Sequence, residues 1–271
     1  MNLVNGIESG RLDPRDRGLC YGDGVFRTLA VRAGKPVLWR RQYAKLAADS
    51  AALRIDCPSL QTLERDLAQV AARHADGVIR ITLTRGIAAR GYAIPEIANI
   101  TRIVSWSPAP GARVAEKSAG ARVCWCSLRL AIQPALAGIK HLNRMENVLA
   151  RSEWHDPDIA EGLLRDANGH VIGGTMSNLF LLRAGELGTP ALEGSGVAGV
   201  IRDLIIERAR KEGLALRIGA VAPDEVRAAD ALFLVNSVIG VWPVAALGDM
   251  TWGANPFADR LRSWIKDAEN R

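Results

Sequence analysis

The sequence predicts a mixed α/β protein of two domains, residues 1–110 and 111–271. Runs in which apolar and polar residues alternate, as in strands, are interspersed with runs whose apolar residues recur at helical spacing. The order of these runs lacks the regular strand–helix–strand repeat of a doubly wound sheet or a TIM barrel. The segment 107–113, SPAPGAR, has two prolines and a glycine between two strand-like runs, so it marks the domain boundary.

The first domain is predicted to contain a hairpin followed by helices and two further strands. The β-rich run 25–32 (VFRTLAVR) and the run 36–39 (PVLW) flank the turn at residues 33–35. Helical spacing then follows in two segments, and two strand-like runs close the domain. These four segments are 41–53 and 60 to about 76 for the helices, and 78–86 and 102–106 for the strands.

The second domain alternates strands, helices and glycine-rich turns. The stretch 168–182, NGHVIGGTMSNLFLL, is predicted to be a hairpin that turns at Asn168-Gly169 and is interrupted by Gly173-Gly174. Two glycines inside a strand-like run indicate that another group comes close to the backbone there. The remaining elements are strands at 122–130 and 230–236, helices at 143–154, 200–211 and 255–269, and a loop with glycines at 194, 196 and 199.

The composition indicates a globular cytoplasmic protein. Of the 271 residues, 48% are hydrophobic, and the net charge is +6 with a pI of about 9.4. No window approaches the ~18 consecutive apolar residues of a membrane span, and the N-terminus lacks the features of a signal peptide. The basic residues are scattered and form no aromatic-interleaved stripe, so we expect a small anionic substrate, and neither nucleic acid nor membrane as a partner.

Four cysteines are present, and only Cys124 and Cys126 are close in sequence. Their C-W-C spacing fits neither a zinc knuckle nor a C-x-x-C redox pair, so no metal site is predicted. On an alternating strand both side chains would point to the same face. We therefore expect this pair, together with Cys20 and Cys57, to be small buried apolar residues in a reducing compartment.

Lys140 is the first candidate for a catalytic residue. It lies between the apolar run 134–139 and a predicted helix. Partial desolvation would lower the pKa of its amine and favour the neutral form that Schiff-base chemistry requires. The alternative is a lysine at a strand end, whose stem packs on apolar surface while its amine reaches water.

The loop 194–203, GSGVAGVIRD, is rich in glycine and opens a helix. Free backbone N–H groups of Gly199, Val200 and Ile201 at that helix N-terminus would suit a phosphate. The loop is neither a G-x-G-x-x-G nor a Walker A motif, so a flexible loop before a helix is the alternative.

Two further segments offer polar groups. Ser237 follows the carboxyl end of an apolar strand, where polar residues often line a site but also form ordinary turns. The loop 84–95, with Arg85, Arg90 and Tyr92, is either an anion-binding loop or a solvated basic one. A lysine, a phosphate cradle, small hydroxyl groups and a second anion site together indicate a phosphate-bearing aldehyde cofactor, pyridoxal 5′-phosphate (PLP).

Six motifs occur in an order that resembles a known family. They are YGDGVF (21–26), TRG to RGY (84–92), GIKHLNR (138–144), G-x-V-x-x-x-x-x-SNLF (169–180), G-x-x-G-x-x-R (196–202) and NS to WPV (236–244). Nearly end to end, the chain is similar to the class IV, fold-type IV PLP enzymes, which include branched-chain and D-amino-acid aminotransferases and aminodeoxychorismate lyases. The KHLNR sequence, with RGY upstream, is most similar to the lyases.

The resemblance implies a two-domain fold-type IV architecture with the cofactor site between the domains, a homodimer, and roles for particular residues. Lys140 corresponds to the lysine that bonds to PLP, and Thr28 would face the site near it. Lys45 falls where the family usually has a phosphate-binding arginine, and a lysine keeps the charge without the bidentate fork. The other cofactor residues implied are Val200 and Ile201 as backbone donors to the phosphate, Ser237 as a hydroxyl donor, Val197 as a packing residue on the pyridine ring, and Ser177, Asn178 and Leu179 on the strand beside the cofactor.

Gly173 departs from the family pattern. In the family's V-x-E-x-x-x-x-N-L-F, the glutamate bonds to the pyridine nitrogen, and the matching residue in VIGGTMSNLF (171–180) is Gly173. Glycine has no side chain for this role, and Thr175 would be a neutral substitute. The resemblance therefore implies that the cofactor loses this partner and becomes a weaker electron sink.

The function implied by the resemblance is a lyase that converts 4-amino-4-deoxychorismate to 4-aminobenzoate and pyruvate, a step toward folate. Lys140 would first remove a proton from the substrate and then return one, as a general base and acid. Arg90, Arg85 and Tyr92 would hold the two substrate carboxylates. We expect Gly173 to slow the lyase and nearly abolish transamination. A class IV aminotransferase for branched-chain or D-amino acids and a catalytically silent PLP-binding protein are the alternatives.

Overall fold

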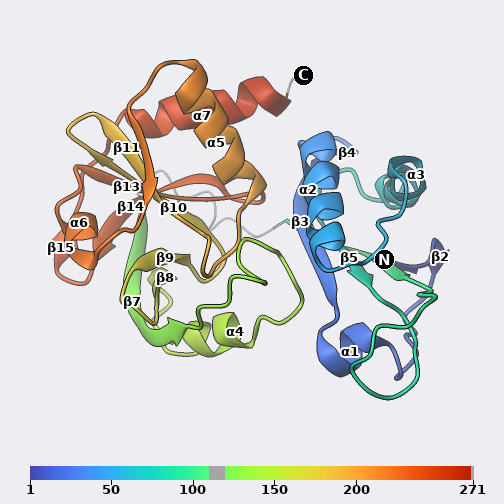
Figure 1. The fold of residues 1–271 in the computed structure, drawn as a ribbon. Coiled ribbons are helices and arrows are strands. Elements are labelled where there is room, and N and C mark those ends of the chain that lie inside the picture. Colours follow the sequence, from blue (N-terminus) through green and yellow to red (C-terminus); the bar gives the residue numbers. More distant parts are fainter. Residues whose placement is uncertain (110–119, 270–271) are drawn as a thin grey trace. The chain divides into compact units, whose positions relative to one another are not determined.

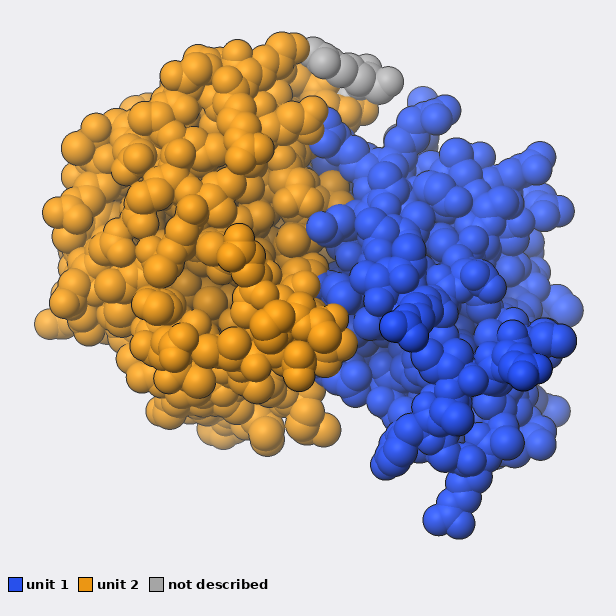
Figure 2. All heavy atoms as spheres, in the orientation of Figure 1, with its two compact units in different colours: residues 1–110, 139–143 blue, residues 111–138, 144–271 orange. Residues whose placement is uncertain are grey.

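The computed structural model describes residues 1–109 and 120–269, and it confirms the prediction of a mixed α/β fold. The chain forms two compact units (Figure 2). Unit 1 contains residues 1–110 and 139–143, and unit 2 contains residues 111–138 and 144–271. The predicted boundary segment, 107–113, starts at the end of a strand, and its residues from 110 onward lie outside the described residues.

Unit 1 is built on a six-stranded antiparallel sheet in the order β2-β1-β6-β5-β3-β4 (Figure 1). Strands β3 and β5 form its longest pairing, from Gly24 opposite Thr84 to Val31 opposite Gly77. The predicted hairpin is present, although its second strand is short. The strands are β1 (Asn2–Val4), β2 (Ile7–Glu8), β3 (Gly24–Arg32), β4 (Lys35–Pro36), β5 (Gly77–Thr84) and β6 (Thr101–Ser107).

Helices α2 and α3 cover the apolar face of this sheet. Leu46 of α2 and Leu63 of α3 are fully buried with Val25 and Ile79 of the strands in one core cluster. Trp39, which the sequence placed at the end of a strand, instead opens α2, and its indole N–H donates to Glu64 at 3.1 Å. The helices of unit 1 are α1 (Arg17–Tyr21), α2 (Trp39–Ala52) and α3 (Leu60–Ala71).

Residues 139–143 belong to unit 1, whereas the sequence analysis assigned everything after residue 110 to the second domain. Ile139 is buried in the unit 1 core, and His141 forms an isolated antiparallel bridge with Val25 at the start of β3. The physical reason is that, among the described residues, the edge of β3 beside Gly24 to Phe26 has no other strand as a neighbour. Residues 139–143 supply hydrogen-bond partners for the backbone groups of this edge.

Unit 2 contains a nine-stranded mixed sheet in the order β12-β11-β10-β13-β14-β7-β8-β9, with β15 beside β14 (Figure 1). The sheet curls, because the terminal strand β9 also contacts β10 and β11. The β14–β7, β7–β8 and β11–β12 pairs are parallel. The strands are β7 (Ala121–Leu130), β8 (Ile159–Asp166), β9 (Val171–Gly174), β10 (Asn178–Arg183), β11 (Glu186–Pro190), β12 (Leu216–Gly219), β13 (Ala231–Asn236), β14 (Gly240–Leu247) and β15 (Met250–Thr251).

Four helices accompany this sheet. Helices α5 and α7 pack against each other, and they contact β13 and β14 respectively. The helix predicted at 143–154 is shorter in the structure, because the chain turns after Arg151 and the indole N–H of Trp154 donates to the carbonyl of Ile159 at 3.1 Å. The helices of unit 2 are α4 (Met145–Arg151), α5 (Val200–Lys211), α6 (Pro223–Arg227) and α7 (Phe257–Glu269).

The predicted hairpin at Asn168-Gly169 is formed by β8 and β9. The chain then leaves β9 at Gly174, makes a short turn, and re-enters the sheet as β10, which lies between β11 and β13. The stretch 168–182 therefore supplies two strands with different neighbours, joined by the turn 175–177. No helix among the described residues combines the length and the apolar character that a membrane crossing requires.

Candidate functional site

Lys140 is held by its neighbours on both sides in the chain. The N–H of Phe26 donates to the carbonyl of Lys140 at 3.0 Å, and the N–H of Leu142 donates to the carbonyl of Gly24 at 3.0 Å. On the other side, Ile139 is anchored in the unit 1 core. The backbone of the candidate catalytic lysine is therefore tied to β3 and to the apolar core of the same unit.

A buried carboxylate holds the N–H of Lys140. A continued antiparallel ladder would offer this N–H to the carbonyl of Phe26, but it donates to Asp49 Oδ2 at 2.9 Å instead. Asp49 lies on α2 and forms an ion pair with Arg27 of β3, and the two side chains are 5% and 3% exposed. Arg27 also donates to the carbonyl of Lys45 at 3.5 Å, one turn earlier in α2.

The amine of Lys140 lies against the ring of Phe26, with Nζ 4.5 Å from the ring centroid. The guanidinium of Arg80 lies 3.9 Å from the same centroid. Thr28 is half-buried two residues further along β3, on the same face of the strand as Phe26. Lys45 is half-buried on α2. Lys140, Thr28 and Lys45 thus all lie in unit 1, with Phe26 as the immediate neighbour of the amine.

Arg85 is occupied inside unit 1, and this corrects its predicted role in substrate binding. It is 4% exposed, and its guanidinium donates to both oxygens of Asp23 at 2.9 and 3.0 Å and to the carbonyls of Leu53 and Arg54. A buried guanidinium bound in this way holds the loop together and is not available to a ligand. Burial acts to raise the pKa of Asp23, but hydrogen bonds from Arg85 and Arg17 outweigh it and hold that pKa below its ordinary value.

The side chains of Arg90 and Tyr92 are exposed, while the backbone between them is fixed. Arg17 donates to the carbonyls of Gly91 and Tyr92 at 2.9 and 3.3 Å, and the hydroxyl of Tyr21 accepts the N–H of Gly91 at 3.2 Å. The rings of Tyr21 and Tyr92 lie 5.3 Å apart. This loop presents a cation and a phenol on an ordered backbone, which an anion-binding role requires.

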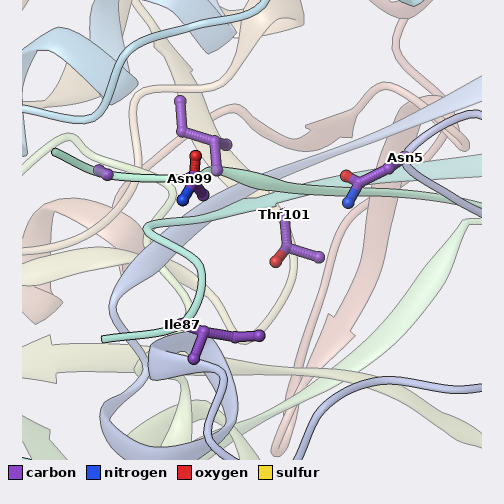
Figure 3. Close-up of a pocket in the computed structure, with 6 residues that line it drawn as sticks. Asn5, Ile87, Asn99 and Thr101 are labelled. Carbon is purple, nitrogen blue, oxygen red and sulfur yellow. The ribbon is translucent and has the colours of Figure 1, made fainter. Parts of the chain in front are cut away.

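Unit 1 also has a hollow of about 600 Å³ on its surface (Figure 3). None of the predicted site residues lines it. The side-chain oxygen of Asn5 already accepts the N–H of Arg102 at 2.8 Å, so we assign no ligand to this hollow. Its lining residues are Asn5, Ile87, Ala98, Asn99, Ile100 and Thr101.

In unit 2, helix α5 presents an uncapped N-terminus. Among the described residues no side chain caps it, and the first N–H groups of a helix, here those of Val200 and Ile201, have no intrahelical partner. Asn178 shapes the preceding loop, because its amide donates to the carbonyl of Val197 at 2.7 Å and accepts the N–H of Gly199 at 3.1 Å. A Cβ at position 199 would lie 2.4 Å from that amide oxygen, so glycine permits the close approach.

The loop before α5 is also tied to the chain that leads to Lys140. Gly138, two residues before the lysine, donates its N–H to the carbonyl of Gly196 and accepts the N–H of Ala198, each at 3.0 Å. The resulting parallel bridge joins Gly138 and Val197. The glycine-rich loop is therefore an ordered part of unit 2, which favours the phosphate cradle over the flexible-loop interpretation.

Ser237 lies in the turn between β13 and β14. Asn236, directly before it, accepts the N–H groups of Val238 and Ile239 at 2.9 and 2.8 Å and donates to the carbonyl of Met176 at 3.2 Å. Since Met176 precedes β10, this amide links the Ser237 turn to the start of that strand.

Glu161 of β8 organises the turn between β9 and β10, and the sequence analysis missed it. Its carboxylate is 1% exposed. One oxygen accepts the N–H groups of Gly162 and Thr175, each at 3.0 Å, and the Thr175 hydroxyl, and the other accepts the N–H of Met176 at 3.1 Å and the hydroxyl of Ser177 at 2.9 Å. Ser177 and Thr175 therefore direct their hydroxyls to Glu161. The sequence does contain a signal for this residue, because a single acidic residue in the apolar run 159–164 (IAEGLL) indicates a buried carboxylate with specific partners.

The backbone at Gly173 excludes a side chain. Its φ is +155°, and a Cβ there would lie 2.8 Å from the carbonyl oxygen of Ser177. The N–H of Gly174 donates to that same carbonyl at 2.9 Å, which fixes the approach. The family's glutamate is therefore not merely deleted, because the turn has a conformation into which a glutamate does not fit without a backbone shift.

The four cysteines are free thiols. Cys126 is fully buried beside Ala150 and Trp154, and burial raises its pKa to about 12, so it packs as a small apolar group. Cys20 is exposed, contrary to expectation, because it lies on the outer side of α1. Within residues 1–109 and 120–269 no group of three or more His, Cys, Asp or Glu residues is arranged to hold a metal ion.

Comparisons with known proteins show which family this chain is similar to. Residues 24–247 match the family described as amino-transferase class IV. The chain is 32% identical to the aminodeoxychorismate lyase of Vibrio harveyi over 91% of each chain. The crystal structure of 4-amino-4-deoxychorismate lyase from Pseudomonas aeruginosa is similar with a TM-score of 0.93, at 43% identity over 98% of each chain.

The fold is also that of a hypothetical aminotransferase from Mycobacterium tuberculosis in its PLP-bound form. That structure aligns with a TM-score of 0.85 at 21% identity, and the alignment covers 100% of both chains. The likeness at this identity concerns the fold alone. Since the family match covers most of the sequence and the Vibrio relative is similar along nearly the whole chain, this protein belongs to the class IV aminotransferase family.

Proposed function

We propose that this protein is a PLP-dependent lyase that converts 4-amino-4-deoxychorismate to 4-aminobenzoate and pyruvate. The observation that carries the proposal is Lys140, whose backbone is fixed at both ends and whose amine lies against Phe26. Support comes from the 32% and 43% identities to aminodeoxychorismate lyases over nearly the whole chain.

Each unit offers groups whose chemistry suits one end of PLP. Lys140 offers the amine that would bond to the aldehyde carbon. The uncapped N-terminus of α5 offers the N–H groups of Val200 and Ile201 to the phosphate, and Ser237 would add a hydroxyl. When bound, PLP supplies an electron-withdrawing ring that stabilises negative charge developing on the substrate.

At the pyridine nitrogen, this chain lacks the glutamate that the family uses as a partner. Position 173 has no carboxylate, and its backbone leaves no room for one. A lyase tolerates this better than an aminotransferase, because formation of an aromatic ring drives the reaction. This difference favours the lyase over the aminotransferase alternative.

Lys140 would move both protons of the reaction. As a neutral amine it removes the proton from the substrate carbon that carries the amino group, and it then returns a proton to the departing methylene carbon. Thr28, on the same face of β3 as Phe26, would face the site near this amine. Arg90 and Tyr92, which are exposed on an ordered loop, would hold the substrate carboxylates.

The test is an assay of the purified protein with PLP and 4-amino-4-deoxychorismate, without any 2-oxo acid. We expect 4-aminobenzoate and pyruvate in equal amounts, and we expect Lys140→Ala to lose both the product and the cofactor's absorption band. A parallel reaction contains PLP, an amino acid and a 2-oxo acid. Amino-group transfer in this second reaction, without release of 4-aminobenzoate in the first, would establish the aminotransferase alternative. A cofactor band without either activity would establish the silent PLP-binding protein.

The same proposal includes a homodimer. Helix α4 exposes Met145, Val148 and Leu149 at 66, 59 and 52%, and Met176 is 54% exposed. The first three recur at helical spacing and form an apolar stripe, which a second copy would cover. Light scattering should give twice the chain mass, and Val148→Asp with Leu149→Lys should yield monomers. A monomeric parent protein at micromolar concentration would exclude the dimer.

A further inference from the structure

We infer that Asp49, held in place by Arg27, is a positioning residue for Lys140. The inference rests on the proposed function, because it gives Asp49 a purpose in the chemistry of that lysine. It goes beyond that function, because neither Asp49 nor Arg27 belongs to the motifs by which the chain resembles its family.

Asp49 contacts the backbone of Lys140 and not its amine. Asp49 accepts the backbone N–H of Lys140 from one side of β3, whereas the amine of that lysine lies against Phe26. Phe26 and Arg27 are adjacent in β3, so their side chains point to opposite faces of the sheet. Asp49 therefore fixes the backbone of the lysine without facing its amine, and it does not act as a proton acceptor.

The charge of Asp49 is balanced inside unit 1. A buried carboxylate is costly unless it is paired and hydrogen-bonded. Arg27 supplies the counter-charge from β3 and also donates to the carbonyl of Lys45 in α2. The pair thereby connects the strand beside Lys140, the helix that carries Lys45, and the N–H of Lys140 itself.

The contact with Asp49 anchors the backbone where the ladder beside β3 ends. The ladder between β3 and the Lys140 segment ends at Lys140, whose N–H turns away from the strand. Without Asp49 this N–H would lose the acceptor that it has in the structure, and the backbone of the lysine would lose one of its anchors. A catalytic amine must be held within a fraction of an ångström to react efficiently.

The closing experiment uses three variants of the full chain: Asp49→Ala, Asp49→Asn, and the pair Arg27→Gln with Asp49→Asn. The matched control is Asp66→Ala, since Asp66 is equally buried in unit 1 and pairs with Arg102 but does not contact the Lys140 segment. Two quantities are measured: the hydrogen-exchange rate of the Lys140 amide, and the rate at which added PLP bonds to Lys140. To measure bond formation, PLP is added, the amine condenses with the aldehyde and one water is released. Borohydride then reduces the new bond, and mass spectrometry gives the fraction of the protein that carries the cofactor.

We expect Asp49→Ala to speed amide exchange at Lys140 and to slow bond formation by about 10- to 100-fold, the factor that corresponds to losing a hydrogen bond to a charged group. Asp49→Asn keeps an acceptor oxygen, so it should lie between Asp49→Ala and the parent. The double variant Arg27→Gln with Asp49→Asn, which leaves no buried charge at these two positions, should restore stability and much of the rate at which PLP bonds to Lys140. Asp66→Ala should lower the melting temperature without changing either quantity at Lys140.

Equal changes in the Asp49→Ala and Asp66→Ala proteins would overturn the inference, because both would then reflect general loss of stability. Unchanged amide exchange in Asp49→Ala would overturn it too. If the parent protein forms no bond with PLP, the proposed function fails, and amide exchange at Lys140 still decides whether Asp49 positions the lysine.

Discussion

Two buried carboxylates, Asp49 in unit 1 and Glu161 in unit 2, hold backbone N–H groups of segments that carry candidate site residues, but they are stabilised differently. Asp49 pairs with Arg27 and takes the N–H of Lys140. Glu161 has no cationic partner among the described residues, and three backbone N–H groups and two hydroxyls surround it.

The two carboxylates fix their segments in different ways. An ion pair between β3 and α2 couples elements that are distant in sequence, so the lysine is tied to the packing of the whole unit. A carboxylate surrounded by neutral donors fixes one turn locally, because four of its five donors come from the three residues after Gly174. Substitution of Asp49 should therefore affect the stability of the whole of unit 1, whereas substitution of Glu161 should mainly affect the turn between β9 and β10.

The largest effect is expected from Asp49→Ala. This change leaves the charge of Arg27 buried without its counter-charge, which typically costs about 3–5 kcal/mol of unfolding free energy. Replacing both partners with apolar residues, as in Arg27→Met with Asp49→Leu, should recover most of that loss. Denaturant unfolding measures both, and a double variant as unstable as the single one would show that the charge is not the cause.

The second effect is expected from Glu161→Gln. The amide group of glutamine would face donors, so at least one hydrogen bond to a charged group is lost, about 1.5–3 kcal/mol. Glu153→Gln is the control, since the exposed Glu153 carboxylate also accepts two backbone N–H groups, at 2.6 and 2.9 Å. Thermal unfolding of the two variants should rank Glu161→Gln as clearly less stable, and equal losses would contradict the role of burial.

The third effect concerns Gly173 in the turn that Glu161 holds. Gly173→Ala should cost about 1–3 kcal/mol, the usual penalty for forcing a side chain into a sparsely populated backbone conformation. Gly253→Ala is a fitting control, because a Cβ at that position meets nothing within 4 Å. Gly173→Glu should destabilise the protein further without raising the rate of 4-aminobenzoate release. A faster, equally stable Gly173→Glu enzyme would show that the turn adapts.

The smallest effect is expected from acid, through the third carboxylate, Asp23. Because Arg85 and Arg17 hold its pKa below the ordinary value of 3.8, its ionised form stabilises the folded state above that value. This contribution is lost as the pH falls below about 3.8 toward the folded-state pKa. The difference in melting temperature between the parent protein and Asp23→Asn should therefore become smaller as the pH falls from 6 to 3. A difference that stays constant over this range would contradict the link between the pKa of Asp23 and stability.

Much of the fold could be predicted because its signals are local. Helix α5 has the predicted bounds, 200–211, and α3 begins at the predicted residue 60 but ends at Ala71, before the predicted end near residue 76. Apolar periodicity runs through both helices, and Ser59 and Gly199 mark their starts. The short strands β1, β2, β12 and β15 were not predicted. A strand of two to four residues is defined by its partner, and its own sequence carries little signal.

In the candidate site, the lysine, the glycine-rich start of α5 and the absence of a glutamate at position 173 could each be predicted from a short run of adjacent residues. The family could be predicted from six such runs in order. Tertiary structure alone decided that Arg85 is an internal residue and that position 173 excludes a side chain. It also decided that Asp49 and Glu161 hold the two segments. The contact between Asp49 and Lys140 joins residues that are 91 positions apart in the sequence, and the contacts of Glu161 reach residues up to 16 positions away. A buried charge must find its partners wherever folding brings them, so those partners are a property of the packed chain.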